Sequence, residues 1–222
     1  MTRLLISTIF VLASAAGARA DIITFFDFND SDLVSDRGQT ATITTTFGAL
    51  GFATGSTVGA DPDGAGPETP SAAGQALNLV GSANNSNHIQ FGVSTLGLVP
   101  TQLSFATQRS STGFNNNELL FSLDGGQSFT TVGFFTPPTT FGLQTFNLAS
   151  LVALQNQPEV VFRILLNGAS SATGTNRIDN LLVTGDPLSV PVPEPMSVLL
   201  LGAGLLGVAR TVRRRSRDGG HR

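Results

Sequence analysis

Short runs of apolar and β-branched residues fill the middle of the chain, and clusters of Gly, Asn, Ser and Pro separate them. This spacing is typical of the strands and turns of an antiparallel β-sandwich, whereas the 3.6-residue period of an amphipathic helix does not appear. The pattern predicts about ten short strands. The clearest of them cover residues 22–28, 40–47, 88–93, 102–108, 118–123, 129–135, 145–148, 160–166 and 177–184.

The run 118–123 shows how the pattern assigns a face. Leu119, Phe121 and Leu123 occupy alternate positions, so we expect them to point toward the core. The following Asp-Gly-Gly at 124–126 supplies residues that accept a positive φ, which predicts a tight hairpin turn with residues 128–132 as the returning strand. Residues 55–74, rich in Gly, Pro and Asp, predict a long loop.

Both ends of the chain carry apolar runs of a different kind. At the N-terminus Arg3 precedes an uncharged, mostly apolar run, after which Ala18 and Ala20 occupy positions −3 and −1 of a signal-peptidase site. This pattern predicts a signal peptide over residues 1–20, cleaved before Asp21. We therefore expect the chain to meet the Sec translocon and signal peptidase, and to cross the inner membrane.

The C-terminal run follows Val192, Pro193, Glu194 and Pro195, and the prolines prevent a helix from extending backwards through them. The apolar stretch 196–209 spans about 21 Å as a helix, which is shorter than the roughly 30 Å hydrocarbon core. We expect the single transmembrane helix to extend over about 196–212, with the long side chain of Arg210 reaching the headgroups. The cluster that marks the cytoplasmic side comprises Arg210, Arg213, Arg214, Arg215 and Arg217.

This order of Pro-Glu-Pro, Gly- and Leu-rich helix and Arg cluster resembles the PEP-CTERM sorting signal of exported proteins in Gram-negative bacteria that make exopolysaccharide. The resemblance covers about the last thirty residues. It implies transient anchoring in the inner membrane, cleavage near the motif by an exosortase-type membrane protease, and a final location at the cell surface or outside the cell. The expected organisation is a signal peptide (1–20), a β domain (21–187) and a sorting segment (188–222).

Charge is distributed unevenly along the chain. Six of the twelve basic residues lie between Arg210 and Arg222, whereas thirteen acidic residues and four arginines between residues 21 and 190 give that region a net charge of −9. Neutralisation of nucleic-acid phosphates needs basic clusters, so we exclude nucleic acid as a partner.

Composition limits the chemistry further. Cysteine is absent, which excludes disulfides, thiolate metal sites and a Cys nucleophile. Tyr and Trp are also absent, so the core must rely on the 16 Phe residues together with Leu, Val and Ile. Tyr and Trp are the residues that most often stack on sugars and bases, and their absence argues against a conventional aromatic binding platform.

Catalytic residues are sparse in the exported part. His88 is its only histidine, and without a strained Gly-x-Ser-x-Gly turn we interpret it as a solvent-facing residue at a strand edge. A glycosidase needs two carboxylates about 5 to 9.5 Å apart, for which Glu118, Glu159 and Asp179 are candidates without an accompanying aromatic platform. We therefore predict that the protein is not an enzyme, with a secreted polysaccharide-acting hydrolase as the alternative.

Segments 121–129, 161–163 and 174–185 are similar to jelly-roll domains that recur in PEP-CTERM proteins and in extracellular carbohydrate-associated modules. The resemblance implies that the Arg-Ile-Asp-Asn segment at 177–180 begins a closing strand that pairs with the first strand. In related galactose-binding-like sandwiches a structural calcium lies near the chain ends, which would involve Asp27, Asn29 or Asp179; the alternative is that these are turn and capping residues. We predict no cofactor.

Together these observations predict an exported protein of the cell envelope or extracellular matrix. Its all-β domain, a jelly-roll-like sandwich, would act by binding or as a structural element, with exopolysaccharide as the candidate ligand.

Overall fold

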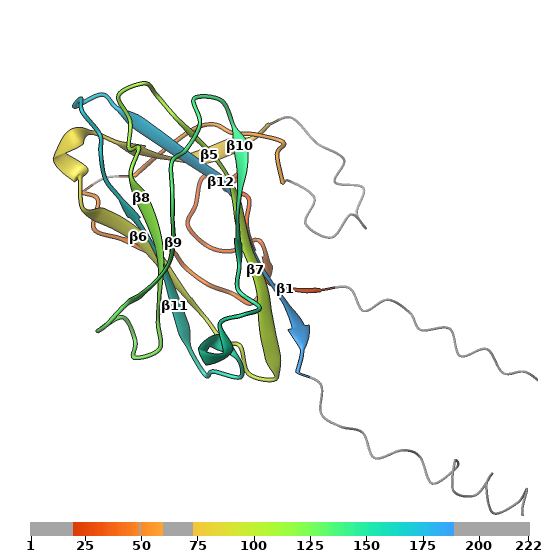
Figure 1. Ribbon diagram of the computed structural model, residues 1–222. Helices are drawn as coiled ribbons and strands as arrows, with labels where there is room; N and C mark the ends of the chain where they lie inside the picture. The colour runs from red at the N-terminus through yellow and green to blue at the C-terminus, as the bar shows by residue number, and fades with distance from the viewer. Residues whose placement is uncertain (1–19, 49, 60–72, 189–222) are drawn as a thin grey trace, which may run out of the picture. The chain divides into compact units, whose positions relative to one another are not determined.

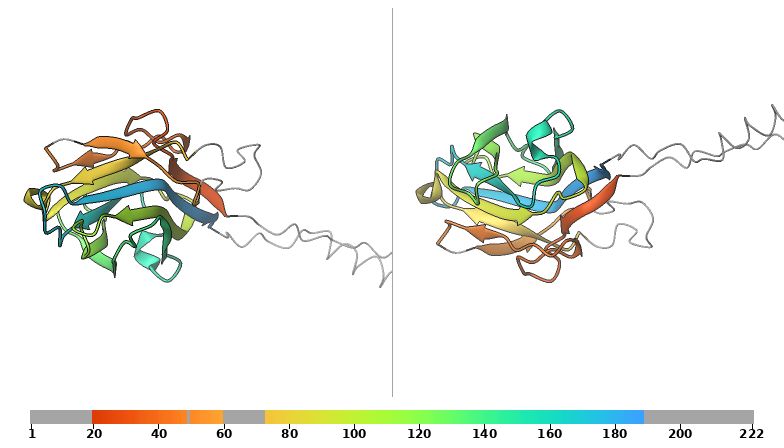
Figure 2. Two further views of the ribbon diagram at one scale, coloured as in Figure 1. Left: turned by 90° about the horizontal axis from the view of Figure 1, so that it is seen from above. Right: turned by 90° about the horizontal axis from the view of Figure 1, so that it is seen from below.

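The computed structural model describes residues 20–48, 50–59 and 73–188, and these form two antiparallel β-sheets packed face to face (Figures 1 and 2). This arrangement confirms the predicted all-β sandwich. The described domain belongs to the first of two compact units, Met1–Leu188, while the second unit, Ser189–Arg222, lies outside the described residues. Regular helix in the described part is limited to two single 3₁₀ turns, η1 (Ser82–Asn84) and η2 (Val152–Leu154).

The larger sheet has seven strands in the order β10-β7-β12-β1-β2, with β5 paired to β12 and β4 paired to β5. The closing strand β12 is antiparallel to the first strand β1, with Ile22 opposite Thr184 and Phe26 opposite Leu181, as the sequence resemblance implied. The strands of this sheet are β1 (Asp21–Phe26), β2 (Arg37–Gly38), β4 (Gly51–Thr54), β5 (Gln75–Val80), β7 (Leu98–Arg109), β10 (Gly142–Asn147) and β12 (Thr175–Pro187).

The smaller sheet has five strands in the order β3-β6-β11-β8-β9. Strands β8 and β9 form the predicted hairpin, but residues 123–129 connect them, so the turn is longer than predicted and the returning strand begins at Thr130. Within this connection Gly125 and Gly126 have φ 70° and 89°, which only glycine adopts without strain. The five strands are β3 (Thr44–Thr45), β6 (Asn87–Val93), β8 (Asn117–Ser122), β9 (Thr130–Phe135) and β11 (Val160–Leu166).

Phenylalanine rings join the two sheets in the core. Phe26 on β1 meets Phe91 on β6 edge to face at 5.4 Å, and Phe105 on β7 meets Phe135 on β9 in the same way at 5.3 Å. Edge-to-face pairs at these separations add to the free energy gained from burying the rings. A core built of Phe in place of Trp and Tyr buries no indole or phenol group that would need a hydrogen-bond partner.

Strand β12 changes its neighbour halfway along its length. On one side of β12, residues 175–178 pair with β5 and the later residues pair with β1. On the other side β12 pairs with β7, and that register shifts between Asp179 and Leu182. Asn180 at this shift has φ 50°, in the left-handed region that Asn adopts more readily than most residues. Asp179 and Asn180 therefore lie where neither strand supplies a complete ladder of backbone partners.

The strands depart from the prediction in several places. Of the predicted strand 40–47, only Thr44–Thr45 forms β3, with one isolated bridge between Val34 and Thr42. Strands β2, β4 and β5 were not predicted; the longest of them, β5 (Gln-Ala-Leu-Asn-Leu-Val), contains only one β-branched residue and no aromatic one. Leu123 was wrongly assigned to the core: β8 ends at Ser122, and Leu123 begins the turn with 43% of its surface exposed.

Candidate functional site

The outer face of the five-stranded sheet carries a group of polar and aromatic side chains. On β11, Arg163 lies between Phe162 and Ile164, which are both buried, so alternation directs Arg163 away from the core. Gln90 on β6 lies directly opposite Arg163 and therefore shares its face. We call this surface the open face, and its residues are His88, Gln90, Glu118, Phe129, Phe134 and Arg163.

Arg163 is held flat on the open face by two neighbours. Its guanidinium carbon lies 3.6 Å from the centroid of the Phe129 ring, and its Nε and Nη2 donate to Oε1 of Gln90 at 2.9 and 2.6 Å. Stacking on an aromatic ring and a two-pronged hydrogen bond both fix the plane of a guanidinium. Burial lowers the pKa of Arg163, but an arginine remains a cation at neutral pH. Two of its five N–H groups donate to Gln90, and the others form no hydrogen bond within the described residues, so they are available to a ligand.

Phe134 supplies the exposed aromatic surface of the open face, with 70% of its area accessible to solvent. It lies directly opposite Glu118 in the β8–β9 pair, and Oε1 of Glu118 accepts a hydrogen bond from Thr131 at 2.5 Å. An aromatic ring therefore does accompany Glu118, contrary to the sequence analysis. The strand register that brings the two together includes a shift between Leu119 and Leu120, which alternation alone does not reveal.

His88 lies inside the five-stranded sheet, because β6 pairs with β11 on one side and β3 on the other. The expected strand-edge position is therefore wrong, and the residue is half-buried. Burial and, to a smaller extent, the charge of Arg163 lower the pKa of His88, which keeps the ring neutral at pH 7. In the part of the chain that the structure describes, the ring hydrogen-bonds only to the Thr46 hydroxyl, at 3.4 Å from Nδ1, so these residues form no Ser-His-acid triad.

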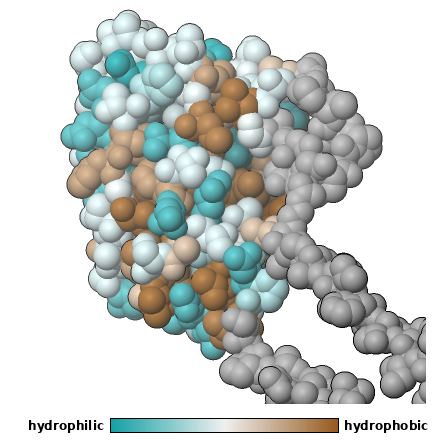
Figure 3. Space-filling view, turned by 45° about the vertical axis from the view of Figure 1, so that its right-hand side comes forward, coloured by the Kyte–Doolittle hydropathy of each residue, from teal (hydrophilic) through white to brown (hydrophobic). Residues whose placement is uncertain are grey.

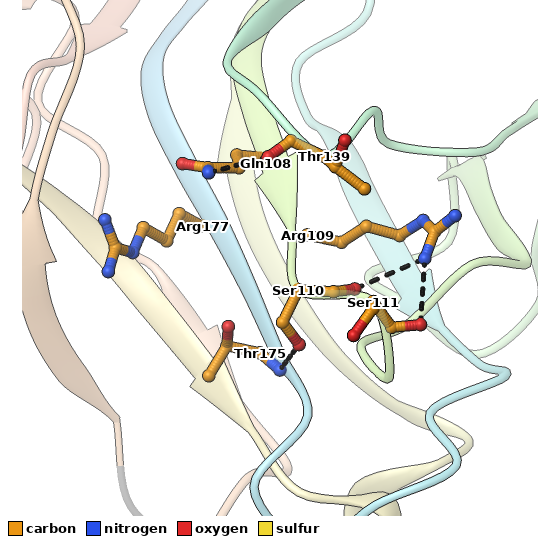
Figure 4. A pocket seen from close by; sticks show the side chains of 7 residues that line it. All are labelled: Gln108, Arg109, Ser110, Ser111, Thr139, Thr175 and Arg177. Atoms are coloured by element: carbon orange, nitrogen blue, oxygen red, sulfur yellow. Dashed lines mark hydrogen bonds between the residues drawn. The ribbon is translucent and has the colours of Figure 1, made fainter.

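A pocket of about 320 Å³ opens on the seven-stranded sheet (Figure 4). The guanidinium groups of its two arginines point away from each other, Arg109 toward the backbone oxygens of Pro137, Ser110 and Ser111, and Arg177 toward the backbone oxygen of Thr54. Hydroxyl and amide groups lie between them. The lining residues are Gln108, Arg109, Ser110, Ser111, Thr139, Thr175 and Arg177.

The three carboxylates considered for a hydrolase are not brought together. Glu118 is opposite Leu165 on β11, whereas Glu159 lies six residues earlier on the same chain segment, a distance of about 20 Å along an extended strand. Asp179 belongs to the other sheet. A pair of these residues therefore cannot span the 5 to 9.5 Å that glycoside hydrolysis requires.

Asp179 is buried, with 1% of its surface exposed, and it binds the backbone of two other residues. Its two carboxylate oxygens accept from the backbone N–H groups of Ser56 and Asn180, at 2.6 and 2.9 Å. The side chain of Asn180 donates to the backbone oxygens of Ser56 and Val58, both at 2.9 Å. We call these two residues and the segment 55–58 that they hold the clamp. Burial and, to a smaller extent, the charge of Asp27 raise the pKa of Asp179 to about 7, although its two backbone hydrogen bonds act in the opposite direction.

The residues considered for calcium make hydrogen bonds within the domain. Oδ1 of Asp27 accepts from the Asn29 backbone and Oδ1 of Asn29 accepts from the Gln75 backbone, whereas Asp179 is buried in β12 and holds the backbone of Ser56. Among the residues that the structure places, no group of three or more acidic or histidine side chains is arranged to hold a metal ion. The structure therefore supports the alternative assignment for Asp27 and Asn29, which act in a turn, while Asp179 is a strand residue.

The end signals fall largely outside the described residues. These comprise Ala18, the sorting motif Val192, Pro193, Glu194 and Pro195, and the cluster of Arg210, Arg213, Arg214, Arg215 and Arg217. Ala20 is exposed, and Asp21 is the first residue of β1. None of the helices placed by the structure is long and apolar enough to cross a membrane.

On the face that Figure 3 shows, apolar side chains lie in small groups separated by polar ones.

Comparison with known proteins shows similarity of fold. No family model and no curated protein matches the sequence. Among solved structures, the CBM22-1-CBM22-2 tandem domain of Paenibacillus barcinonensis Xyn10C is similar with a TM-score of 0.50 at 10% identity, over 81% of this chain and 50% of that one. The CBM22-1 xylan-binding domain of the same protein gives 0.48 at 10% identity, over 78% of this chain and 100% of its own.

A complex of TmCBM61 with β-1,4-galactotriose gives a TM-score of 0.40 at 13% identity, over 72% of this chain and 94% of that one. At such low identities a similarity concerns the fold and not the ligand. The tandem domain therefore supports the β-sandwich architecture.

Proposed function

We propose that this chain is an exported, non-catalytic polysaccharide-binding protein that contacts its ligand through the open face. The observation that carries the proposal is that the exposed Phe134 ring lies on the same outer face as the ordered layer of Phe129, Arg163 and Gln90. An aromatic ring packs against the C–H groups of a sugar, while planar amide, carboxylate and guanidinium groups hydrogen-bond to neighbouring hydroxyls.

The remaining features agree with a neutral glycan as the ligand. The acidic net charge of the domain disfavours polyanions, and the half-buried His88 adds no positive charge at neutral pH. Carbohydrate-binding modules are present among proteins of similar fold, which makes xylan and β-1,4-galactan suitable first probes.

Binding is tested with the full exported chain, purified in detergent, by affinity electrophoresis in gels that contain xylan or β-1,4-galactan. We expect retardation by at least one glycan. Phe134→Ala and Arg163→Ala should each weaken binding about tenfold, which corresponds to 1.4 kcal/mol. Val152→Ala, at a position that is also 70% exposed but belongs to η2, is the matched control and should bind as the wild type does.

Equal mobility with and without glycan, across both polymers and an exopolysaccharide extract, would refute the proposal. Release of reducing ends from the glycan during the experiment would instead favour a hydrolase.

For the ends of the chain we propose export through the Sec translocon, transient anchoring in the inner membrane and cleavage near Pro193-Glu194-Pro195 by an exosortase-type protease. The proposal rests on the order of the three sequence features at the C-terminus. Glu194→Ala should leave uncleaved precursor in the membrane fraction, whereas Glu159→Ala, an exposed acidic position in the β domain, should be processed normally. Mass spectrometry of the mature ends checks both results, and normal release of the Glu194 variant would contradict the sorting proposal.

A further inference from the structure

The pocket on the seven-stranded sheet faces away from the open face. Gln108 and Arg177 are direct partners across β7 and β12, and each lies next to a fully buried residue, Thr107 and Ile178 respectively. Alternation therefore directs Gln108 and Arg177 to the outer side of this sheet. The two sheets pack by their inner faces (Figures 1 and 2). Because the pocket and the open face lie on the outer sides of different sheets, they point in opposite directions.

The pocket is equipped to hydrogen-bond a hydroxyl-rich ligand. Gln108 donates its amide N–H to the Thr139 backbone at 2.9 Å, which orients the amide and leaves its oxygen as an acceptor. The hydroxyls of Ser111, Thr139 and Thr175 form no hydrogen bond within the described residues and remain available as donors and acceptors. Each such hydroxyl offers one donor and two acceptor positions, like the hydroxyls of a sugar.

The charge of the pocket selects against some ligands. Its lining contains no carboxylate, so its contacts with sugar hydroxyls would come from hydroxyl, amide and guanidinium groups. Its two guanidinium groups diverge and are bound to backbone oxygens, so they do not converge on one anion as in a bidentate phosphate or carboxylate site (Figure 4). The pocket therefore has no bidentate site for an acidic group, and a neutral glycan can occupy it through hydroxyl and amide contacts.

A single glycan strand cannot occupy both surfaces directly. The sheets are about 10 Å apart with side chains extending beyond each of them, and the strands β9 and β10 form the sheet edges on one side. A strand that reached both surfaces would have to bend around this edge.

From these observations we infer that the domain has two glycan-binding surfaces and cross-links two neutral polysaccharide strands. The inference rests on the proposed function, because it assigns the first strand to the open face, and it adds the pocket as the site for a second strand. Cross-linking gives the protein a structural role in an extracellular matrix that one binding surface would not provide. Where many such proteins join the same two strands, each link raises the avidity of the strands for one another.

A capture experiment with the full chain in detergent tests the inference. Xylan or β-1,4-galactan, whichever the protein binds, is fixed to a surface, the protein is bound and washed, and a fluorescent soluble form of the same glycan is added. We expect the wild type to retain the fluorescent glycan. The open-face variant Phe134→Ala should retain at least tenfold less fluorescent glycan, because one of its two surfaces is weakened. The combined pocket variant Gln108→Ala, Ser111→Ala and Thr139→Val should still bind the fixed glycan but should also retain at least tenfold less fluorescent glycan.

Controls separate this inference from the others. Thr42→Val combined with Thr57→Val changes two exposed threonines that line neither surface and should behave as the wild type. Failure of the wild type to bind the fixed glycan would refute the proposed function itself. Binding without retention of the second glycan would refute only the cross-linking. Retention by the pocket variant would show that pairs of molecules, and not two surfaces on one molecule, join the strands, which would also overturn the inference.

Discussion

The two sheets differ in how much of their outer face is left free. On the five-stranded sheet, Arg163, Gln90 and Phe134 stay at the surface. On the seven-stranded sheet, Phe25 and Leu182 point outward by alternation, yet they are 1% and 8% exposed. The clamp holds the segment 55–58 near β12, and the pocket opens on the same outer face. Alternation therefore identifies an outer face, but contacts distant in the sequence decide whether that face is available to a ligand.

The largest expected effect is the difference in stability between removing a buried and an exposed phenylalanine of the five-stranded sheet. Phe121→Ala empties a core position on β8 and should lower the free energy of unfolding by about 3 to 5 kcal/mol. Phe134→Ala on the neighbouring strand removes an exposed ring and should change it by less than about 0.5 kcal/mol. Denaturant titration measures both, and equal losses for the two variants would show that the assignment of faces is wrong.

A smaller effect concerns the base of the clamp. A Cβ at Gly55 would lie 2.4 Å from the Ala73 backbone oxygen and 2.5 Å from Oδ2 of Asp179. Gly55→Ala should therefore force the segment away from β12 and lower the free energy of unfolding by about 1 to 3 kcal/mol. Gly51→Ala is the control, because a Cβ there meets no atom within 4 Å. Unchanged stability of the Gly55 variant would show that the segment is not packed tightly against the sheet.

The clamp should also make stability depend on pH. The folded-state pKa of Asp179 is about 7, above its ordinary value of 3.8, so between these values the folded chain holds a proton that the unfolded chain has lost. This contribution is complete below about pH 4 and is lost as the pH rises through 7, with a slope of at most about 1.4 kcal/mol per pH unit. Asp36, whose pKa burial and its acidic neighbours raise to about 6, acts in the same direction.

Denaturant titrations from pH 4 to 8 test this dependence. We expect Asp179→Asn to reduce the loss of stability toward pH 8, whatever it does to stability at pH 4. Hydrogen bonds from Ser122 and Ser128 hold the pKa of Asp124 below its usual range, so Asp124 titrates outside this window and Asp124→Asn is the matched control. A wild-type stability that rises from pH 4 to 8 would contradict the assignment of Asp179.

The smallest expected effect is that of calcium removal. Because an oxygen of each of Asp27, Asn29 and Asp179 accepts a backbone N–H, and the described residues form no cluster of three acidic or histidine side chains suited to a metal, a chelator should leave the Tm unchanged. Thermal unfolding with and without EGTA measures this, with magnesium added in both samples to keep ionic conditions equal. A decrease of several degrees in EGTA that calcium restores would revive the calcium hypothesis.

Much of the fold was predictable because local patterns determine it. The β8–β9 hairpin follows from alternating apolar residues and the Gly125-Gly126 turn, and the pairing of β12 with β1 followed from a sequence resemblance. Strand β5 was not predictable in this way, because its pairing with β12 and β4 compensates for a weak strand propensity.

The candidate surfaces were less predictable than the fold. Glu118 was noted for its charge, but its neighbour Phe134 depends on a register shift within the hairpin. Arg163 and Phe129 are 34 positions apart in the sequence and meet only through tertiary contact. The same holds for the pocket, whose residues come from β7, the connection that follows it, β12 and the connection between β9 and β10. The sequence pattern therefore predicts which face of a strand a residue occupies, but the strand register and the tertiary contacts decide which residues meet on a binding surface.

The central claim is that a glycan binds to the open face, and NMR mapping tests it most directly. The isotope-labelled full chain in detergent is titrated with a xylan or galactan oligosaccharide, and the amide and side-chain signals that move are assigned. The account predicts shifts at Gln90, Phe129, Phe134 and Arg163 together. Shifts confined to the seven-stranded sheet, or none at saturating oligosaccharide, would contradict it.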